Sequence, residues 1–114
     1  MKNAAGVFVH PSISGVTEAL ANAAKTLPED LRFSITNAPG EKSYPISSAT
    51  WLLIYKNQTD PAKGKAVVEF MKWAVTEGQQ YSTALDYAPL PENIQKLDIK
   101  KLETVECNGK SLLK

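Results

Sequence analysis

Five consecutive apolar or aromatic residues, Trp51 to Tyr55, stand near the middle of the chain. Five residues are too few for a typical helix, and no polar residue alternates with them. This pattern predicts a strand that is buried on both faces. The residues just before it, Tyr44 to Thr50, include a proline and several small polar side chains, which disfavour a regular element. We therefore predict that residues 44–56 form an extended crossing that ends in a central strand.

Three elements are predicted ahead of this crossing. Gly6 to His10 alternates weakly up to Pro11, which predicts a short strand or an extended entry segment. Leu31 to Thr36 alternates regularly, which predicts a strand with one buried face. Between them, Ser12 is suited to cap a helix. The apolar residues of that helix recur every three or four positions and form a single stripe: Ile13, Val16, Leu20, Ala23, Ala24 and Leu27.

Helices are predicted after the crossing. Asp60 and Pro61 make a favourable helix start, and Gly78 is expected to loosen or kink the helix before a second helical piece around Tyr81. A last helix is predicted from Glu92 to Glu106. The first of these helices carries a broad apolar stripe: Ala66, Val67, Phe70, Met71, Ala74 and Val75. Its aromatic residues are interpreted as core.

Composition narrows the classes of function. The chain has 114 residues and a net charge of +1, with 43% hydrophobic and 22% charged residues, which fits one α/β domain. A near-zero charge gives no electrostatic support for binding nucleic acid. No apolar run approaches the ~20 residues that span a bilayer. The first residues lack the apolar stretch of a signal peptide, so none is expected in this chain.

Candidate chemistry is sparse. His10, the only histidine, lacks companions at ligand or triad spacing and is interpreted as a polar residue at a strand end. Arg32 is a candidate anion ligand, although its regular neighbours favour a solvated strand residue. Cys107, the only cysteine, cannot form an intrachain disulfide and has no thiolate-activating motif beside it. We expect no catalytic site, no metal and no cofactor, and therefore no enzyme.

The crossing and the segments after it resemble a known family. Tyr44-Pro45-Ile46-Ser47-Ser48-Ala49-Thr50-Trp51-Leu52-Leu53-Ile54-Tyr55-Lys56 is similar to the crossing strand of Pst-type phosphate-binding proteins, the extracytoplasmic receptors of the phosphate ABC importer. The resemblance continues in Lys63 to Ala66, Phe70 to Ala74, Glu77 to Gln79 and Asp86 to Pro91. Upstream, Phe8 to Ser12 and Asn37 to Gly40 also match.

The resemblance implies a partial fold. Members of the family are about three times longer and have two α/β lobes of the type II periplasmic-binding-protein fold, with phosphate held between the lobes. This chain aligns with their last third. The resemblance therefore implies about three short strands and three to four helices drawn from both lobes. Residues 1–43 would belong to one lobe, 44–56 to the crossing and central strand, and 57–114 to the helical C-terminal segment of the other lobe.

The resemblance also implies that phosphate ligands are missing. The family binds phosphate with an N-terminal loop, a serine, an aspartate and an Arg…Ser-Gly-Thr segment, and none of these is found here. Ser14-Gly15-Val16 is superficially similar to Ser-Gly-Thr, but it lacks the threonine and falls in the wrong part of the order. We therefore assign no phosphate-binding residue to this chain. Inorganic phosphate and the ABC permease are expected partners of the full-length receptor, which would be periplasmic or extracytoplasmic.

Two alternatives remain open. An unpaired, buried-type strand at 51–55 favours pairing with another chain, so self-association of the fragment is expected. A stand-alone interaction module that presents a helix face to a protein partner is the other alternative, with Trp73 and Tyr81 as candidate anchors.

Overall fold

The computed structural model describes residues 1–113 of the chain. It combines helices with a small three-stranded sheet, which confirms the α/β class. The α-helices are α1 (Ile13–Ala23), α2 (Pro61–Val75) and α3 (Glu92–Leu102). The strands are β1 (Asn57–Gln58), β2 (Glu106–Cys107) and β3 (Lys110–Ser111), and short 3₁₀ helices occupy Ala24–Thr26, Glu77–Tyr81 and Thr83–Leu85.

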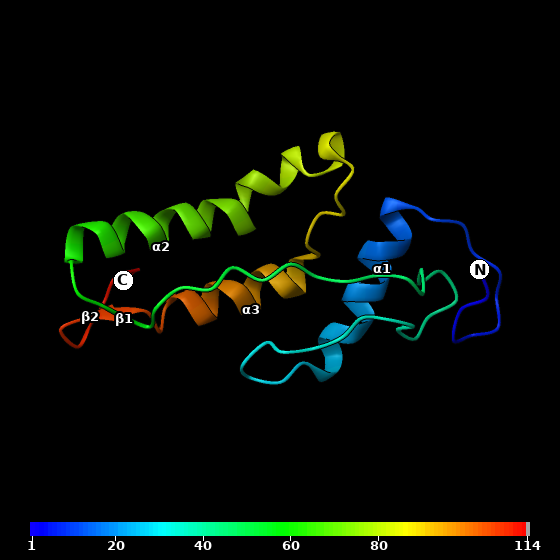
Figure 1. Cartoon of the computed structure of the whole chain (residues 1–114), viewed down its shortest axis with the longest axis horizontal. Coiled ribbons are helices and arrows are strands. Elements are labelled where there is room, and N and C mark those ends of the chain that lie inside the picture. The colour runs from blue at the N-terminus through cyan, green and yellow to red at the C-terminus, as the bar shows by residue number, and fades with distance from the viewer. Residues whose placement is uncertain (114) are drawn as a thin grey trace.

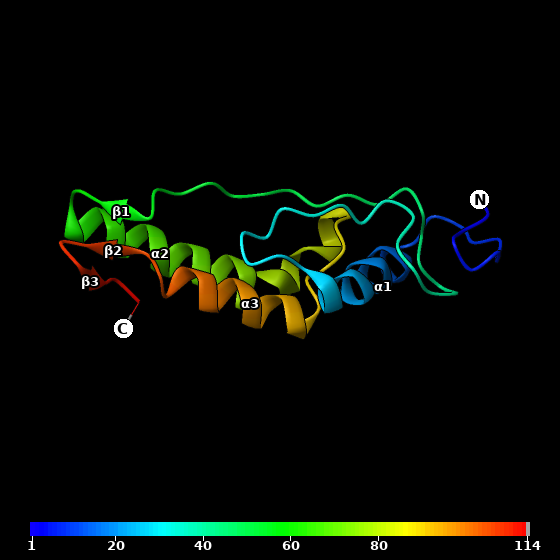
Figure 2. The ribbon, with the colours of Figure 1, turned by 90° about the horizontal axis from the view of Figure 1, so that it is seen from below.

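The molecule is elongated, with principal extents of 51 × 29 × 17 Å. Helices α2 and α3 pack together at one end, with the small sheet, whereas α1 and the N-terminus lie toward the other end (Figure 1). The crossing before β1 runs as extended chain along the long axis, as both views show (Figure 2). β1 pairs in parallel with β2, and β2 pairs antiparallel with β3.

The buried apolar side chains of the described residues form two small hydrophobic clusters rather than a single core. One consists of Leu20 from α1, Ile35 from the extended segment before the crossing, and Ile94 from α3. The other gathers Val68 of α2 with Leu102 and Val105. Helix α3 contributes a buried side chain to each cluster, so it joins the two halves of the molecule.

Both predicted helix caps are confirmed. The Ser12 hydroxyl accepts a hydrogen bond from the Gly15 N–H, at 3.0 Å. The Asp60 carboxylate accepts hydrogen bonds from the N–H groups of Ala62 and Lys63, and Pro61 is the first helical residue. These side chains satisfy N–H groups that a helix start leaves without intrahelical partners.

The apolar stripe of α2 divides between two faces. The inward face consists of Gly64, Val68, Met71 and Val75, and of these Val68 was absent from the predicted stripe although it is fully buried. Phe70 was predicted as core, but 58% of its surface is exposed. The broad stripe therefore combined an inner and an outer apolar face, which the 3.6-residue period alone did not separate.

Two predicted strands, at Leu31 to Thr36 and at Trp51 to Tyr55, are wrong. Leu31 to Thr36 has no ladder, although its burial alternates as predicted, with Ile35 buried and Arg32 exposed. Gly6 to His10 contributes a single bridge, from Lys2 to Phe8. The predicted central strand, Trp51 to Tyr55, is extended but unpaired. A strand needs neighbours for its backbone groups, and the described residues offer none to Leu31–Thr36 or to Trp51–Tyr55.

The C-terminal region also departs from prediction. Helix α3 ends at Leu102 rather than Glu106, and Cys107 lies in β2. Asn108 and Gly109 take left-handed backbone angles, with φ of 51° and 75°, and close a β2–β3 hairpin. The break after α2 occurs at Thr76, whereas Gly78 was expected, and 3₁₀ turns follow as the second helical piece. Lys114 lies outside the described residues.

Candidate functional site

The most distinctive surface of the molecule is the crossing itself. We use the term apolar strip for four large exposed side chains near its end, Trp51, Leu52, Leu53 and Tyr55, whose exposed fractions are 45%, 60%, 93% and 85%. Within the described residues, no backbone group from Ala49 to Tyr55 bonds to another backbone group. A run with the composition of a buried strand therefore lies bare, with both edges unpaired.

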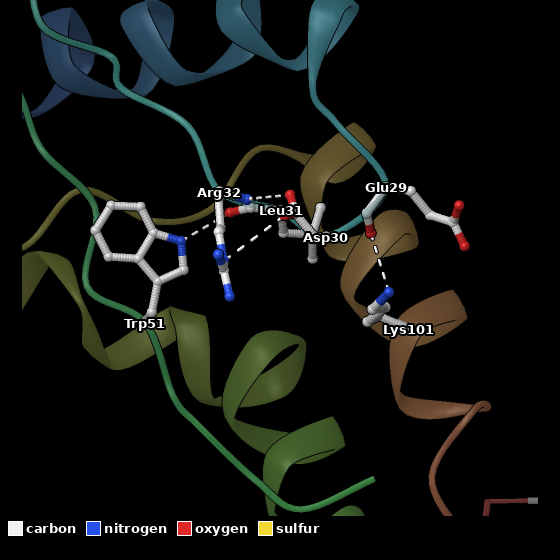
Figure 3. Close-up of polar contacts among 6 residues, drawn as sticks. All are labelled: Glu29, Asp30, Leu31, Arg32, Trp51 and Lys101. Atoms are coloured by element: carbon white, nitrogen blue, oxygen red, sulfur yellow. Dashed lines mark hydrogen bonds and ion pairs between the residues drawn. The ribbon is translucent and has the colours of Figure 1, made fainter.

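Backbone hydrogen bonds attach the two ends of the crossing, at Tyr44, Pro45 and Lys56, and two side chains attach the stretch between them. The Trp51 indole N–H donates a hydrogen bond of 2.9 Å to the Leu31 carbonyl oxygen, and the Trp51 ring meets Phe33 edge-on, with centroids 5.6 Å apart (Figure 3). Ile54 packs on the cluster around Val68. The crossing is thus attached at intervals rather than by a continuous ladder.

A turn at residues 29–32 lies between the crossing and α3. Leu31 has a positive φ of 56°, and the Asp30 carboxylate accepts a bond from the Arg32 backbone N–H. The ammonium group of Lys101 on α3 donates to the Glu29 carbonyl oxygen at 3.1 Å (Figure 3). The turn is therefore connected to α3 through Lys101 and to the crossing through Trp51.

Arg32 was the candidate anion ligand. Its side chain is 89% exposed and lies 3.6 Å from the Asp30 carboxylate. Together with Lys101 it borders an open hollow of about 450 Å³, which Phe33, Trp51 and Leu53 complete. Because Arg32 faces water and already has a carboxylate beside it, this geometry favours the interpretation as a solvated residue over that as an anion ligand.

The segment that superficially resembles an anion-binding motif lies at the start of α1. The Gly15 N–H is already bonded to Ser12, and the Gly15 carbonyl accepts a bond from the Tyr44 N–H. A Cβ at Gly15 would come within 3.2 Å of Tyr44, so the glycine permits close packing of the helix on the crossing. Ser14-Gly15-Val16 therefore has a clear packing role.

The remaining candidates are separated from one another. His10 is exposed in the N-terminal segment, whereas Cys107 is buried in β2 at the other end of the molecule. Among the described residues, no group of three or more His, Cys, Asp or Glu side chains is arranged to hold a metal ion.

The two anchors suggested for an interaction module are exposed. Trp73 and Tyr81 are 42% and 55% exposed, and Trp73 also stacks on Phe70 with ring centroids 5.9 Å apart. We use the term aromatic cluster for these three residues. It forms the outer apolar face of α2 and its 3₁₀ extension, so the interpretation of these aromatic residues as core is wrong for the chain by itself.

One carboxyl group was not singled out in the sequence. Asp98 lies one helical turn from both Ile94 and Leu102, the two α3 residues that are buried in the clusters. Burial raises the pKa of Asp98 from 3.8 to about 6. At the exposed start of α3, by contrast, the hydrogen bond and charge of Lys96 lower the pKa of Glu92. The sequence held one signal for this: Asp98 is four residues from each of the apolar residues Ile94 and Leu102, and residues four apart share one face of a helix.

Comparison with known proteins gives one consistent result. The chain is 38% identical to the phosphate-binding protein PstS of Pasteurella multocida over 98% of its own length and 33% of that protein. It is 38% identical to PstS of Xylella fastidiosa over 84% of its length and 26% of that protein. A putative serine/threonine-protein kinase/receptor of Acanthamoeba polyphaga mimivirus is 30% identical over 96% of the chain, but this is only 7% of that protein. No family model matches.

These likenesses place the chain in the class of phosphate-binding proteins, whose names denote binding rather than catalysis. More narrowly, it is a PstS-like sequence. The chain spans about a third of the length of the curated relatives that it matches, so it corresponds to a part of a PstS-like protein. Among residues 1–113, no helix is both long and apolar enough to cross a membrane.

Proposed function

We propose that this chain is a structural segment of a phosphate receptor, which we call the frame segment because it contributes to the fold but not to phosphate binding. The phosphate-binding groups belong to PstS-like sequence which the chain does not span. The observation that carries this proposal is the match to PstS proteins along nearly the whole chain, over only a third of their length. The geometry supports it, because Arg32 is solvated and the Gly15 amide at the start of α1 already has a partner.

The frame has the layout that the resemblance implies. Residues 1–43 would pack in one lobe of the receptor, residues 44–56 would cross between the lobes, and residues 57–114 would pack in the other. The two hydrophobic clusters follow this division only in part: Leu20 and Ile35 lie before the crossing, but Ile94, which lies after it, packs with them. The full receptor would bind inorganic phosphate outside the cytoplasm and deliver it to an ABC permease.

The experiment uses two proteins. One is the 114-residue chain; the other is a chimera in which this chain replaces the matching third of Pasteurella multocida PstS. Isothermal titration with inorganic phosphate is expected to show no binding to the chain and saturable binding to the chimera. Micromolar binding by the chain alone would refute the frame assignment. A folded chimera that does not bind phosphate would refute the receptor assignment.

A second candidate function has one observation in its favour, the exposure of the aromatic cluster. Aromatic side chains that remain partly exposed on a helix are typical anchors for protein partners. If the chain acts as a free-standing module, Trp73→Ala should abolish capture of a specific protein by a variant that still unfolds cooperatively. Recovery of the same proteins by the variant and by the unmodified chain would exclude this role.

A further inference from the structure

We propose that the outer apolar face of α2 pairs with the same face of a second copy of this chain, with the two helices antiparallel. The inference goes beyond the receptor assignment and does not depend on phosphate binding. It rests on how side-chain size and charge are distributed along α2 itself.

Helix α2 carries a second apolar stripe, away from the inward face that packs on the cluster around Val68. Ala62, Ala66 and Phe70 are four residues apart, and Trp73 follows three residues later, so these four side chains lie on one side of the helix. All four are exposed, and we call them the outer face. In Figure 1, α2 lies along one border of the molecule with α3 on its inner side. The outer face is therefore open to a partner.

Side-chain size changes halfway along the outer face. The first half holds the two alanines, whereas the second half holds Phe70 and Trp73 and is extended by Tyr81. When two such helices run antiparallel, the large half of each lies over the small half of the other, so the two helices can approach closely. In a parallel pair the aromatic side chains would meet one another and the alanines would face a gap.

Charge at the edge of the outer face favours the same arrangement. Lys65 and Glu69 are exposed along one edge, 3.8 Å apart. Antiparallel helices bring the same edge of each copy together. In the register that sets Phe70 over Ala66 of the second copy, Glu69 is offset from the second Lys65 by about 3 Å along the axis, which these side chains can span. Parallel helices would instead bring Lys65 beside Lys63 of the second copy, where like charges repel.

The contact is small but sufficient for a reversible dimer. A buried aromatic side chain covers about 150–250 Å², and the three residues of the aromatic cluster are between 42% and 58% exposed. They therefore leave roughly 300 Å² to bury in each copy, or about 600 Å² in the pair. The alanines and the lysine stems beside them bring the total toward the ~1,000 Å² at which specific interfaces begin. We expect a dissociation constant on the order of 10 µM.

Sedimentation equilibrium of the 114-residue chain, over about 1 to 200 µM at low salt, tests the pairing. The expected result is a reversible equilibrium between monomer and dimer. A chain that stays monomeric over this range would refute the proposal. Assemblies that grow beyond two copies would refute it as well, because an antiparallel pair of identical faces is closed.

Ala66→Phe distinguishes a fitted contact from general stickiness. Because Ala66 is exposed, the variant should keep the helical circular dichroism of the unmodified chain. A larger side chain at this position blocks the place of the second aromatic cluster, so dimerisation should weaken by about tenfold or more. Ala4→Phe, at an exposed alanine of the N-terminal segment, is the matched control and should leave the dissociation constant unchanged. Stronger association of Ala66→Phe would show a non-specific apolar contact and overturn the fitted pair.

Two charge variants test the register without adding apolar surface. Glu69→Lys gives one edge two positive charges, and Lys65→Glu gives it two negative charges. Each variant alone should dimerise about three- to tenfold more weakly, because two attractive pairs become repulsive. An equimolar mixture of the two variants should pair as a heterodimer, and the difference should fade at high salt. If the mixture associates no better than its components, the antiparallel register is wrong.

The chimera separates this proposal from the receptor assignment. A chimera that dimerises, and does so more weakly with Ala66→Phe, would support the pairing whether or not it binds phosphate. A folded chimera that stays monomeric would assign the outer face to the rest of the receptor and overturn the pairing, even if it binds phosphate.

Discussion

Asp98 offers the sharpest test of the packing between α2 and α3. Its carboxyl group follows Ile94 and precedes Leu102 by one helical turn each, and no ion pair of Asp98 is formed among the described residues. Burial raises its pKa from 3.8 to about 6. Replacing it by asparagine removes the ionisable group while nearly keeping its shape.

The sign of the effect follows from proton binding. Between pH 3.8 and 6 the folded chain keeps the Asp98 proton that the unfolded chain has lost. Stability therefore falls as pH rises through this window and stays reduced above it. A shift from 3.8 to about 6 corresponds to roughly 3 kcal/mol in full, and partial exposure of the side chain reduces this to about 1–1.5 kcal/mol.

Urea unfolding followed by circular dichroism between about pH 4 and pH 7.5 measures this contribution. Asp98→Asn should gain about 1–1.5 kcal/mol over the unmodified chain as pH rises across this range. Asp86→Asn is the matched control, since Asp86 is exposed and asparagine tolerates its left-handed φ of 60°. A free-energy difference for Asp98→Asn that stays constant with pH, or that shrinks as pH rises, would refute the reasoning.

Two further substitutions test the packing and capping of α2. In Gly64→Ala the new Cβ would lie 2.7 Å from Leu112 and 2.9 Å from Gln58, so we expect a loss of about 1–3 kcal/mol in urea unfolding despite the better helix propensity of alanine. An unchanged or higher midpoint would contradict the close approach of α2 to β1. Asp60→Ala removes the acceptor of two N–H groups and should cost about 1 kcal/mol, whereas Asp60→Ser should restore most of it. If both variants match the unmodified chain, the cap contributes nothing to stability.

Local chemistry made part of this fold predictable from the sequence. Ser12 and Asp60 marked two helix starts because a short polar side chain ahead of an apolar stripe satisfies specific backbone groups. The stripe of α1 was predictable for a similar reason, since Leu20 buries together with Ala23, Ala24 and Leu27. Asn108-Gly109 carried an equally local signal for a hairpin, but no strand was predicted on either side of it.

The strands were not predictable because strand pairing depends on residues that are far apart in the sequence. Trp51 to Tyr55 has the composition of a buried strand. Composition indicates that the segment favours burial and pairing, but it does not show whether residues 1–113 contain the strands that would pair with it. Phe70 was assigned to the core for the same reason, since a second apolar face on α2 implies a covering layer. Among the candidate site residues, the exposed state of Arg32 agreed with the favoured interpretation. Asp98 was overlooked because no buried face was assigned to the helix predicted from Glu92 to Glu106.

The position of α3 has a mechanical consequence. Ile94 and Leu102 are eight residues apart on one helix, a rise of about 12 Å, and each is clamped in a different cluster. A rotation of this helix about its axis would have to displace both side chains together. Repacking of the cluster at one end of the molecule is therefore transmitted by α3 to the cluster at the other end.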